Sequence, residues 1–337
     1  MFQRLISIAR FRPRLSRRAE WMLRIFLAGA LIYVIYRQLA SREDLPQLAE
    51  AFRYRLGLSG QWMLFLGVLL LMPVNWGLET VKWRLFLHPF SRMSFGRAFF
   101  SVLIGLGAAL LTPARAGEYG GRVLLEESRH RWSGVTATLM GNACQWIIML
   151  LCGLGGGFYF ITRHPGIHFP AGNWAWYVLL GIWAVIAILI LNLSRIADYL
   201  KVLELPQWLS KQIGLLEHYG RRVVRGATAL AFLRYLTFCL QFYLLLLFFG
   251  VGLDADILFS GMATVFIVQA GIPLPGLAGL VARGELALLL WEPLGGDPLA
   301  ILAATLSLFI INLALPSLIG IAGLMGIKSF EHEKHNE

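Results

Sequence analysis

Long apolar runs constrain this chain more than any other feature of its sequence. A helix needs about 20 apolar residues to cross the hydrocarbon core of a bilayer, and six runs of roughly that length occur. They do not show the 3.6-residue alternation that is typical of a helix with one polar face. The sequence therefore predicts an all-α, polytopic membrane protein that forms a single transmembrane domain over residues 1–337. The predicted spans are residues 24–40, 61–87, 132–162, 174–194, 228–252 and 298–326.

The composition agrees with a membrane location and argues against a nucleic-acid partner. Hydrophobic residues make up 58% of the chain and charged residues only 15%, a balance that soluble domains rarely have. The net charge of +11 could attract nucleic acid, but the basic residues lie in short segments between the apolar runs. This placement is typical of topology control, because lysine and arginine stay on the cytoplasmic side. We expect no nucleic-acid partner.

Counts of lysine and arginine in the connecting segments orient the spans. Residues 1–24 carry seven arginines and one acid, which places the N-terminus in the cytoplasm. Segment 195–225 is also rich in cations, whereas segments 41–60 and 162–173 have no such excess. Six crossings return the C-terminus to the cytoplasm. The predicted location is the cytoplasmic (inner) membrane, with no cleavage of the first span.

Two shorter apolar stretches do not fit simple spans. Residues 98–111 number 14 and continue into a segment broken by proline and glycine, with basic residues on both flanks. Residues 257–272 continue into Pro273-Leu274-Pro275-Gly276, and their flanks are acidic. A segment with the same charge signal at both ends enters the membrane and returns to the same side. We therefore predict two re-entrant hairpins of opposite orientation, the first cytoplasmic and the second external.

The order of spans and hairpins predicts an inverted repeat. Each half has two spans, a hairpin and a third span, and the second half begins on the opposite side of the membrane. Transporters often combine two such halves and bind their substrate near the midplane, where helices are broken. The predicted halves are residues 21–162 and 174–326, with cytoplasmic segments 1–20 and 327–337.

Charged residues lie inside both predicted hairpins. The first contains Arg115, Glu118 and Arg122, of which Glu118 and Arg122 are spaced i,i+4 and would share a helix face. The second contains Arg283 and Glu285. A charge at membrane depth costs about 2.5–3.5 kcal/mol on insertion scales, so such residues usually face the protein interior and form pairs. Guanidinium groups near broken helices indicate a phosphate-binding site, in which the carboxylates would hold the arginines.

The second predicted span adds a polar face. Asn75, Glu79 and Lys82 are spaced i, i+4 and i+7, so Glu79 and Lys82 would pair beside the same cavity. In the alternative interpretation, Lys82 belongs to the basic and aromatic belt at the membrane interface, and the arginines of the first hairpin extend to the same interface. Intramembrane amides mostly join helices by hydrogen bonds. Those in this chain are Gln145, Gln241, Gln269 and Asn312.

No catalytic residue, metal site or cofactor is predicted. The sequence contains no G-x-x-x-x-G-K-[ST], H-E-x-x-H or G-x-S-x-G motif. Its three cysteines lie inside apolar runs without metal-ligand spacing. We expect a protein that is not an enzyme.

The hairpin motifs resemble the signatures of the flippase-like membrane domain family, the membrane part of lysylphosphatidylglycerol synthase and of its stand-alone relatives. The resemblance covers about residues 20–325. In one place the chain departs from the family pattern, because Gly284 separates Arg283 from Glu285, which are usually adjacent. The similar motifs are Thr112-Pro113-x-Arg115-x-Gly117-Glu118 with Arg122, Pro273-x-Pro275-Gly276 followed by Gly279, Arg283 and Glu285, and Lys82-Trp83-Arg84.

The resemblance implies a flippase that moves a phospholipid, or another lipid-linked anionic headgroup, between leaflets. A membrane lipid with a phosphate headgroup would be its substrate. In lysylphosphatidylglycerol synthase a cytosolic aminoacyl-transfer domain follows the membrane domain. Because this sequence stops at Glu337, we expect that activity to be absent.

Two other functions are compatible with the sequence. Stand-alone relatives are associated with polyprenyl-phosphate sugar pathways, so the chain could be an accessory protein or a membrane-embedded enzyme of that or of phospholipid metabolism. It could also be a scaffold with a lipid-synthesis enzyme as partner. A homo-oligomer is compatible with each of these functions.

Overall fold

The computed structural model of the chain is all-helical in its described part. Most of the first and fourth predicted spans lies outside that part. The N-terminal segment, the tail and the Pro273–Gly276 motif lie wholly outside it. The structure describes residues 29, 33, 45–112, 115–163, 177–178, 180–183, 219–271 and 278–322.

Four helices are long and apolar enough to cross a membrane, and they coincide with four of the predicted spans. The chain is therefore a multi-pass membrane protein. The main difference from the prediction is that the third long helix begins before residue 228, because its first turns carry arginines that prolong the helix beyond the apolar run. The four are α4 (Gln61–Leu87), α7 (Arg131–Arg163), α11 (Arg221–Phe249) and the helix Pro298–Ala322, which begins with α14 (Pro298–Phe309).

Shorter helices occupy the two interrupted segments. The pair in the first segment consists of α5 (Phe95–Leu111) and α6 (Gly117–Arg122), and the pair in the second consists of α12 (Ala255–Gly271) and α13 (Ala278–Trp291). Helices α5 and α12 have 17 residues each, fewer than a span usually needs. The members of each pair pack against each other. The remaining elements are α3 (Leu45–Gly57) and the 3₁₀ turns η2 (Ser128–His130) and η3 (Glu292–Leu294).

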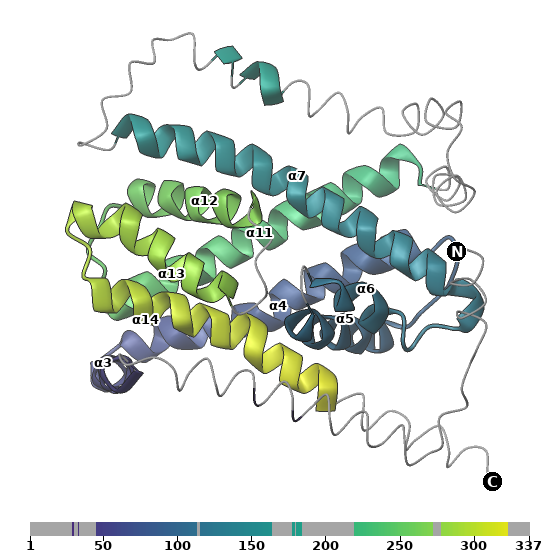
Figure 1. The fold of residues 1–337 in the computed structure, drawn as a ribbon, viewed down its shortest axis with the longest axis horizontal. Coiled ribbons are helices and arrows are strands. Elements are labelled where there is room, and N and C mark those ends of the chain that lie inside the picture. The colour runs from purple at the N-terminus through teal and green to yellow at the C-terminus, as the bar shows by residue number, and fades with distance from the viewer. Residues whose placement is uncertain are drawn as a thin grey trace, which may run out of the picture.

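Helices α4 and α11 pack along most of their length in the centre of the molecule (Figure 1). Gly67 faces Leu244 near one end of the pair, and Gly226 faces Leu85 near the other. Low residue numbers in α4 therefore meet high numbers in α11, which makes the two helices antiparallel.

Glycines bring each of the two longer short helices, α5 and α12, against a long helix of the other predicted half. In α7, a Cβ on Gly156 would come within 2.4 Å of the Ala263 Cβ in α12. In the last helix, a Cβ on Gly320 would come within 2.4 Å of the carbonyl oxygen of Leu103 in α5. Small residues at such contacts let membrane helices approach closely.

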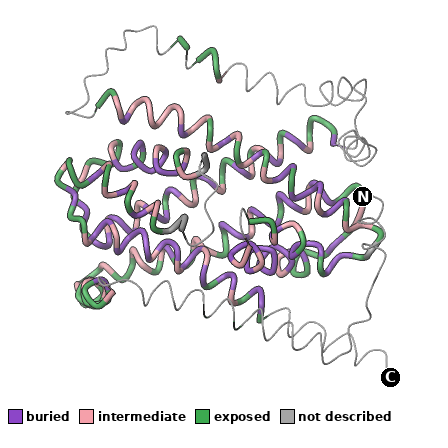
Figure 2. Tube along the Cα trace, viewed as in Figure 1, coloured by how far each residue is buried: buried purple, intermediate pink, exposed green. Residues whose placement is uncertain are grey.

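Figure 2 shows exposed and half-buried residues along the long helices, and many of the exposed ones are large and apolar. Leu70, Trp146 and Leu233 are examples from α4, α7 and α11. A monomeric soluble protein rarely exposes apolar surface on this scale, whereas lipid tails would cover it. The exposed faces therefore agree with the assignment of these helices as spans.

Two facing glycines set the contact between α5 and α6. A Cβ on Gly121 would come within 2.7 Å of the Gly105 Cα, and a Cβ on Gly105 would come within 2.5 Å of the Arg122 Cγ. Neither position has room for a side chain. The close approach places the side chain of Arg122 directly against α5, where this residue is only 2% exposed.

Gly121→Ala is expected to push α6 away from α5 and to lower the free energy of unfolding by about 1–3 kcal/mol, as overpacking usually does. A lower midpoint of thermal unfolding in detergent would show it. Gly120→Ala is the matched control, because a Cβ there has nothing within 4 Å. An equal loss in both variants would contradict the proposed contact.

Candidate functional site

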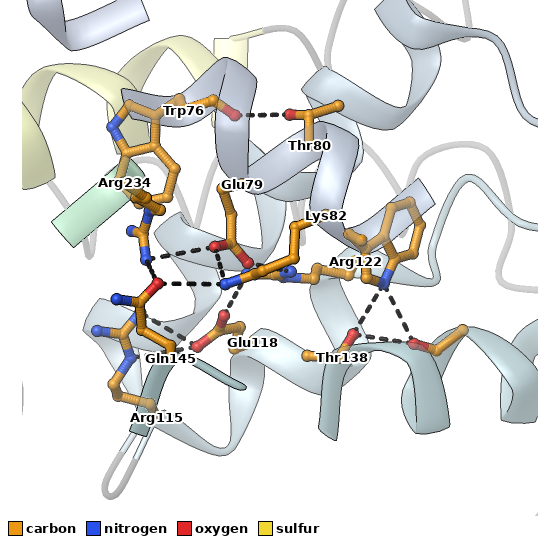
Figure 3. A network of polar contacts seen from close by, with 12 residues as sticks. Trp76, Glu79, Thr80, Lys82, Arg115, Glu118, Arg122, Thr138, Gln145 and Arg234 are labelled. Carbon is orange, nitrogen blue, oxygen red and sulfur yellow. Dashed lines mark hydrogen bonds and ion pairs between the residues drawn. The ribbon is translucent and has the colours of Figure 1, made fainter. Parts of the chain in front are cut away.

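Charged side chains from three helices and one turn form a single connected group inside the protein (Figure 3). They come from α4, from α6 and the turn before it, and from α11, and we call this group the charged cluster. Its members are Glu79, Lys82, Arg115, Glu118, Arg122 and Arg234.

Glu79 is the centre of the charged cluster. Its Oε2 lies 2.6 Å from Lys82 Nζ and 3.3 Å from Arg234 Nη1. Its Oε1 lies 2.9 Å from Arg122 Nη1. The Glu79 side chain is 1% exposed, and burial of an isolated charge would cost several kcal/mol. Three cations around one carboxylate offset that cost.

Glu118 connects Arg122 to Arg115. Arg122 Nη2 donates to Glu118 Oε1, so the predicted i,i+4 pair is confirmed. Arg115 Nε donates to Glu118 Oε2 at 3.2 Å, and its Nη2 lies 3.1 Å from the same oxygen. Arg115 has φ +58, in the left-handed region that residues other than glycine rarely adopt. This bend directs the side chain back toward Glu118 while leaving it 51% exposed.

Thr112 fixes the turn that leads to Arg115. Its hydroxyl accepts a hydrogen bond from the Gly117 N–H at 2.7 Å and donates one to the Ala108 carbonyl at 3.0 Å. The first bond satisfies an N–H group at the start of α6 that has no partner within the helix. The threonine of the first motif therefore joins the end of α5 to the start of α6.

Lys82 and Arg122 are enclosed by the protein. Lys82 is 0% exposed and Arg122 is 2% exposed, so neither side chain reaches the surface, as the alternative interpretation would require. Arg115 alone among the predicted residues of the first hairpin keeps an accessible guanidinium group.

Two further residues of the site were not predicted as part of it. Arg234 in α11 contacts Glu79, donates to Gln145 Oε1 at 3.3 Å and lies over the Trp76 ring at 5.1 Å from its centroid. Gln145 Oε1 also accepts from Lys82 Nζ at 3.3 Å. The Gln145 amide therefore joins α4, α7 and α11, as we expected for an intramembrane amide. It does so inside the charged cluster. The sequence signal for Arg234 was a cation within the apolar run 228–252.

Asn75, one turn before Glu79, joins α4 to the last helix. Its Nδ2 donates to Asn312 Oδ1 at 3.0 Å, and both residues are almost fully buried. Asn312 lies in a π-helical turn, Ile310–Ala314, a feature that often occurs at functional sites. The turn precedes Pro316, which has no N–H to bond the Asn312 carbonyl.

Arg283, on α13, lies outside the charged cluster. Its Nε donates to Gln269 Oε1 at 2.8 Å, and its guanidinium lies 5.7 Å from the centre of the Phe238 ring and 5.9 Å from that of Phe266. Phe238 lies one helical turn after Arg234 on α11, so Arg283 faces α11 next to the cluster.

Glu285 does not balance Arg283 as expected. It is exposed and forms no ion pair in the part of the chain that the structure describes. Arg283 and Glu285 are two residues apart, which corresponds to a rotation of about 200° along a helix. Their side chains therefore lie on different faces of α13.

The charged cluster has more positive than negative charge. Its four cations and two carboxylates leave a surplus of two positive charges. Glu79 and Glu118 are at most 5% exposed, whereas the side chains of Arg115 and Arg234 are 51% and 21% exposed. The most exposed side chains of the cluster are therefore those of Arg115 and Arg234, and guanidinium groups bind phosphate and carboxylate well.

Glu79→Gln is expected to lower the free energy of unfolding by about 3–5 kcal/mol, because it leaves buried cations without their counter-charge. Chemical unfolding in detergent measures the loss. The matched control is Glu285→Gln, which removes an exposed carboxylate and should change stability by no more than about 0.5 kcal/mol. A Glu79→Gln variant as stable as the control would refute the central role of Glu79.

The fold and the site define a class: a helical multi-pass membrane protein with a buried, positively charged cluster beside a broken helix. The family described as lysylphosphatidylglycerol synthase TM region matches residues 21–320, and the chain belongs to this family. The match confirms the family resemblance of the hairpin motifs and includes all residues of the charged cluster. No curated protein and no solved structure matches the chain.

Proposed function

We propose that the protein is a lipid transporter, or flippase, that moves a phospholipid or another lipid-linked anionic headgroup between leaflets. The observation that carries this proposal is the positive surplus of the charged cluster, with Arg115 and Arg234 as its accessible groups. Membership of a family of membrane domains related to lipid synthesis supports a lipid substrate. The headgroup phosphate would bind the guanidinium groups, while its tails remain against the apolar outer faces.

The packing of the helices supports an inverted repeat of two halves, residues 21–162 and 174–326. In the first half α4 packs on α7, α5 on α6, and α6 on α7. In the second half α11 packs on α14, α12 on α13, and α13 on α14. The antiparallel pairing of α4 with α11 is what a two-fold axis in the membrane plane would produce. In such transporters the substrate site lies at the interface of the repeats, and the charged cluster lies where α4 and α11 meet.

In this proposal α5–α6 and α12–α13 are re-entrant hairpins, and both chain termini face the cytoplasm across the inner membrane. The first hairpin enters from the cytoplasm and the second from outside. The short length of α5 and α12 supports re-entrant hairpins. The basic flanks of the first hairpin and the acidic flanks of the second support their opposite orientation.

Cysteines placed at the two hairpins test this topology. Glu127 follows the first hairpin and Glu292 follows the second, and both are exposed. A membrane-impermeant maleimide should label Glu292→Cys from outside, but Glu127→Cys only after the membrane is permeabilised. The wild type gives the background from its own cysteines, which are buried or half-buried. Labelling of both variants from the same side would contradict the opposite orientation of the hairpins.

A membrane-embedded enzyme acting on a lipid-linked substrate is the alternative function, with Glu118 as the candidate base. Both oxygens of Glu118 already accept hydrogen bonds from arginines. A carboxylate held in this way is poorly placed to accept a proton from a substrate. This contact favours a transporter over an enzyme in which Glu118 acts as base.

Arg115→Gln and Arg234→Gln are each expected to slow leaflet exchange of a labelled anionic phospholipid in proteoliposomes by at least about tenfold. Each variant removes an accessible guanidinium that would contribute a charge-assisted hydrogen bond of about 1.5–3 kcal/mol. Fluorescent lipid that remains protected from an external quencher reports the rate.

Arg129→Gln is the matched control for these variants, because Arg129 is 75% exposed and pairs only with Glu127 among the described residues. Its exchange rate should equal that of the wild type. If the site variants also equal the wild type, the charged cluster is not the transport site, and a scaffold function becomes the better interpretation.

A further inference from the structure

Arg283 is a cation whose contacts with the described residues include no counter-charge. No carboxylate of the described residues pairs with it, and its contacts are a neutral amide and two aromatic rings. Such contacts orient a guanidinium and offset part of its desolvation, but they do not neutralise its charge. In an apolar environment a single unpaired cation is costly and usually marks a functional site.

The charge of Arg283 adds to the surplus of the charged cluster. The Phe238 ring that Arg283 faces lies one helical turn from Arg234 of the cluster, on α11. The cluster alone has a surplus of two positive charges, so the site as a whole has a surplus of three. Both carboxylates of the cluster are already surrounded by its own cations, and neither is available to Arg283.

The size of this surplus discriminates between kinds of phosphate headgroup. A phosphodiester carries one negative charge and would leave most of the surplus unbalanced. A phosphate monoester carries about 1.5–2 negative charges at pH 7 and has three strong acceptor oxygens, and a diphosphate carries more charge. An aminoacylated headgroup would bring a further cation into the site.

We propose that the site selects a lipid-borne phosphate monoester or diphosphate, with about two or more negative charges, over a phosphodiester or an aminoacylated lipid. Arg283 acts here as a specificity residue for the second charge. The inference rests on the proposed function, because it concerns the ligand of the same site.

Two lipids that differ by one methyl group test the proposal. Dodecyl phosphate is a monoester, and its O-methyl ester is a diester with the same chain. Their Kd values are measured at pH 7.5 with the full-length protein in phosphatidylcholine nanodiscs, and empty nanodiscs correct for partitioning. The monoester should bind at least about tenfold more tightly, which corresponds to about 1.4 kcal/mol. Equal Kd values would overturn the proposed selectivity and leave the proposed function standing, whereas no binding of either lipid would overturn both.

Arg283→Gln tests the assigned role of this residue. In this variant the ratio of the diester Kd to the monoester Kd should fall below about threefold. The Kd of the monoester should change much more than the Kd of the diester. Arg129→Gln should keep the full preference. An Arg283→Gln variant that unfolds at the wild-type temperature and keeps the full preference would overturn the role of Arg283.

Methyl phosphate separates a lipid from a soluble ligand. It has the same doubly charged headgroup but no chain, so it should compete much more weakly than dodecyl phosphate. If methyl phosphate competed as well as dodecyl phosphate at the same concentration, the site would bind a soluble phosphate compound. That result would overturn the lipid assignment and the proposed function with it.

Discussion

The carboxylate of Glu79 holds together the part of the structure on which the site depends. It contacts Lys82 in its own helix, Arg122 in α6 and Arg234 in α11. In a low-dielectric interior these three cations would repel one another strongly without it. Because the contact joins three helices, it also determines where the first hairpin segment lies relative to the central pair α4 and α11. The position of Arg115, the most exposed side chain of the cluster, follows from where this segment lies.

Close packing of α5 and α6 brings Arg122 into the charged cluster. Gly105 and Gly121 let α6 lie directly on α5, and the same contact seats the stem of Arg122. Broken helices and charged groups are tolerated at membrane depth only where protein or a polar cavity surrounds them. The charged cluster meets this condition, since its two acids and two of its cations are buried and its remaining two cations are accessible. The proposed transport of an anionic headgroup rests on this surplus of positive charge.

Much of the local structure could be predicted from the sequence. The lengths and apolar runs of α4, α7 and the last helix predicted their positions within a few residues, because a bilayer demands a minimum helix length. The i,i+4 spacing of Glu118 and Arg122 predicted their contact, since helix geometry alone brings such residues together. Arg234 was missed, because its role depends on a carboxylate in a different helix. The expected pairing of Arg283 with Glu285 failed for a local reason, since a spacing of two residues places them on different faces of α13.

The sequence by itself determined that this chain is an all-helical membrane protein with charged, broken segments, because the cost of exposing polar groups to lipid leaves few alternatives. It also determined the family, through motifs that are short and continuous. Only the tertiary structure decided that Glu79 joins Arg122 and Arg234, that Lys82 is buried and that Arg283 contacts the amide of Gln269. These contacts join residues far apart in the chain, and neither hydropathy nor helical spacing specifies which helices will meet. The positive surplus of the cluster is therefore a property of the fold, and the proposed anionic headgroup rests on it.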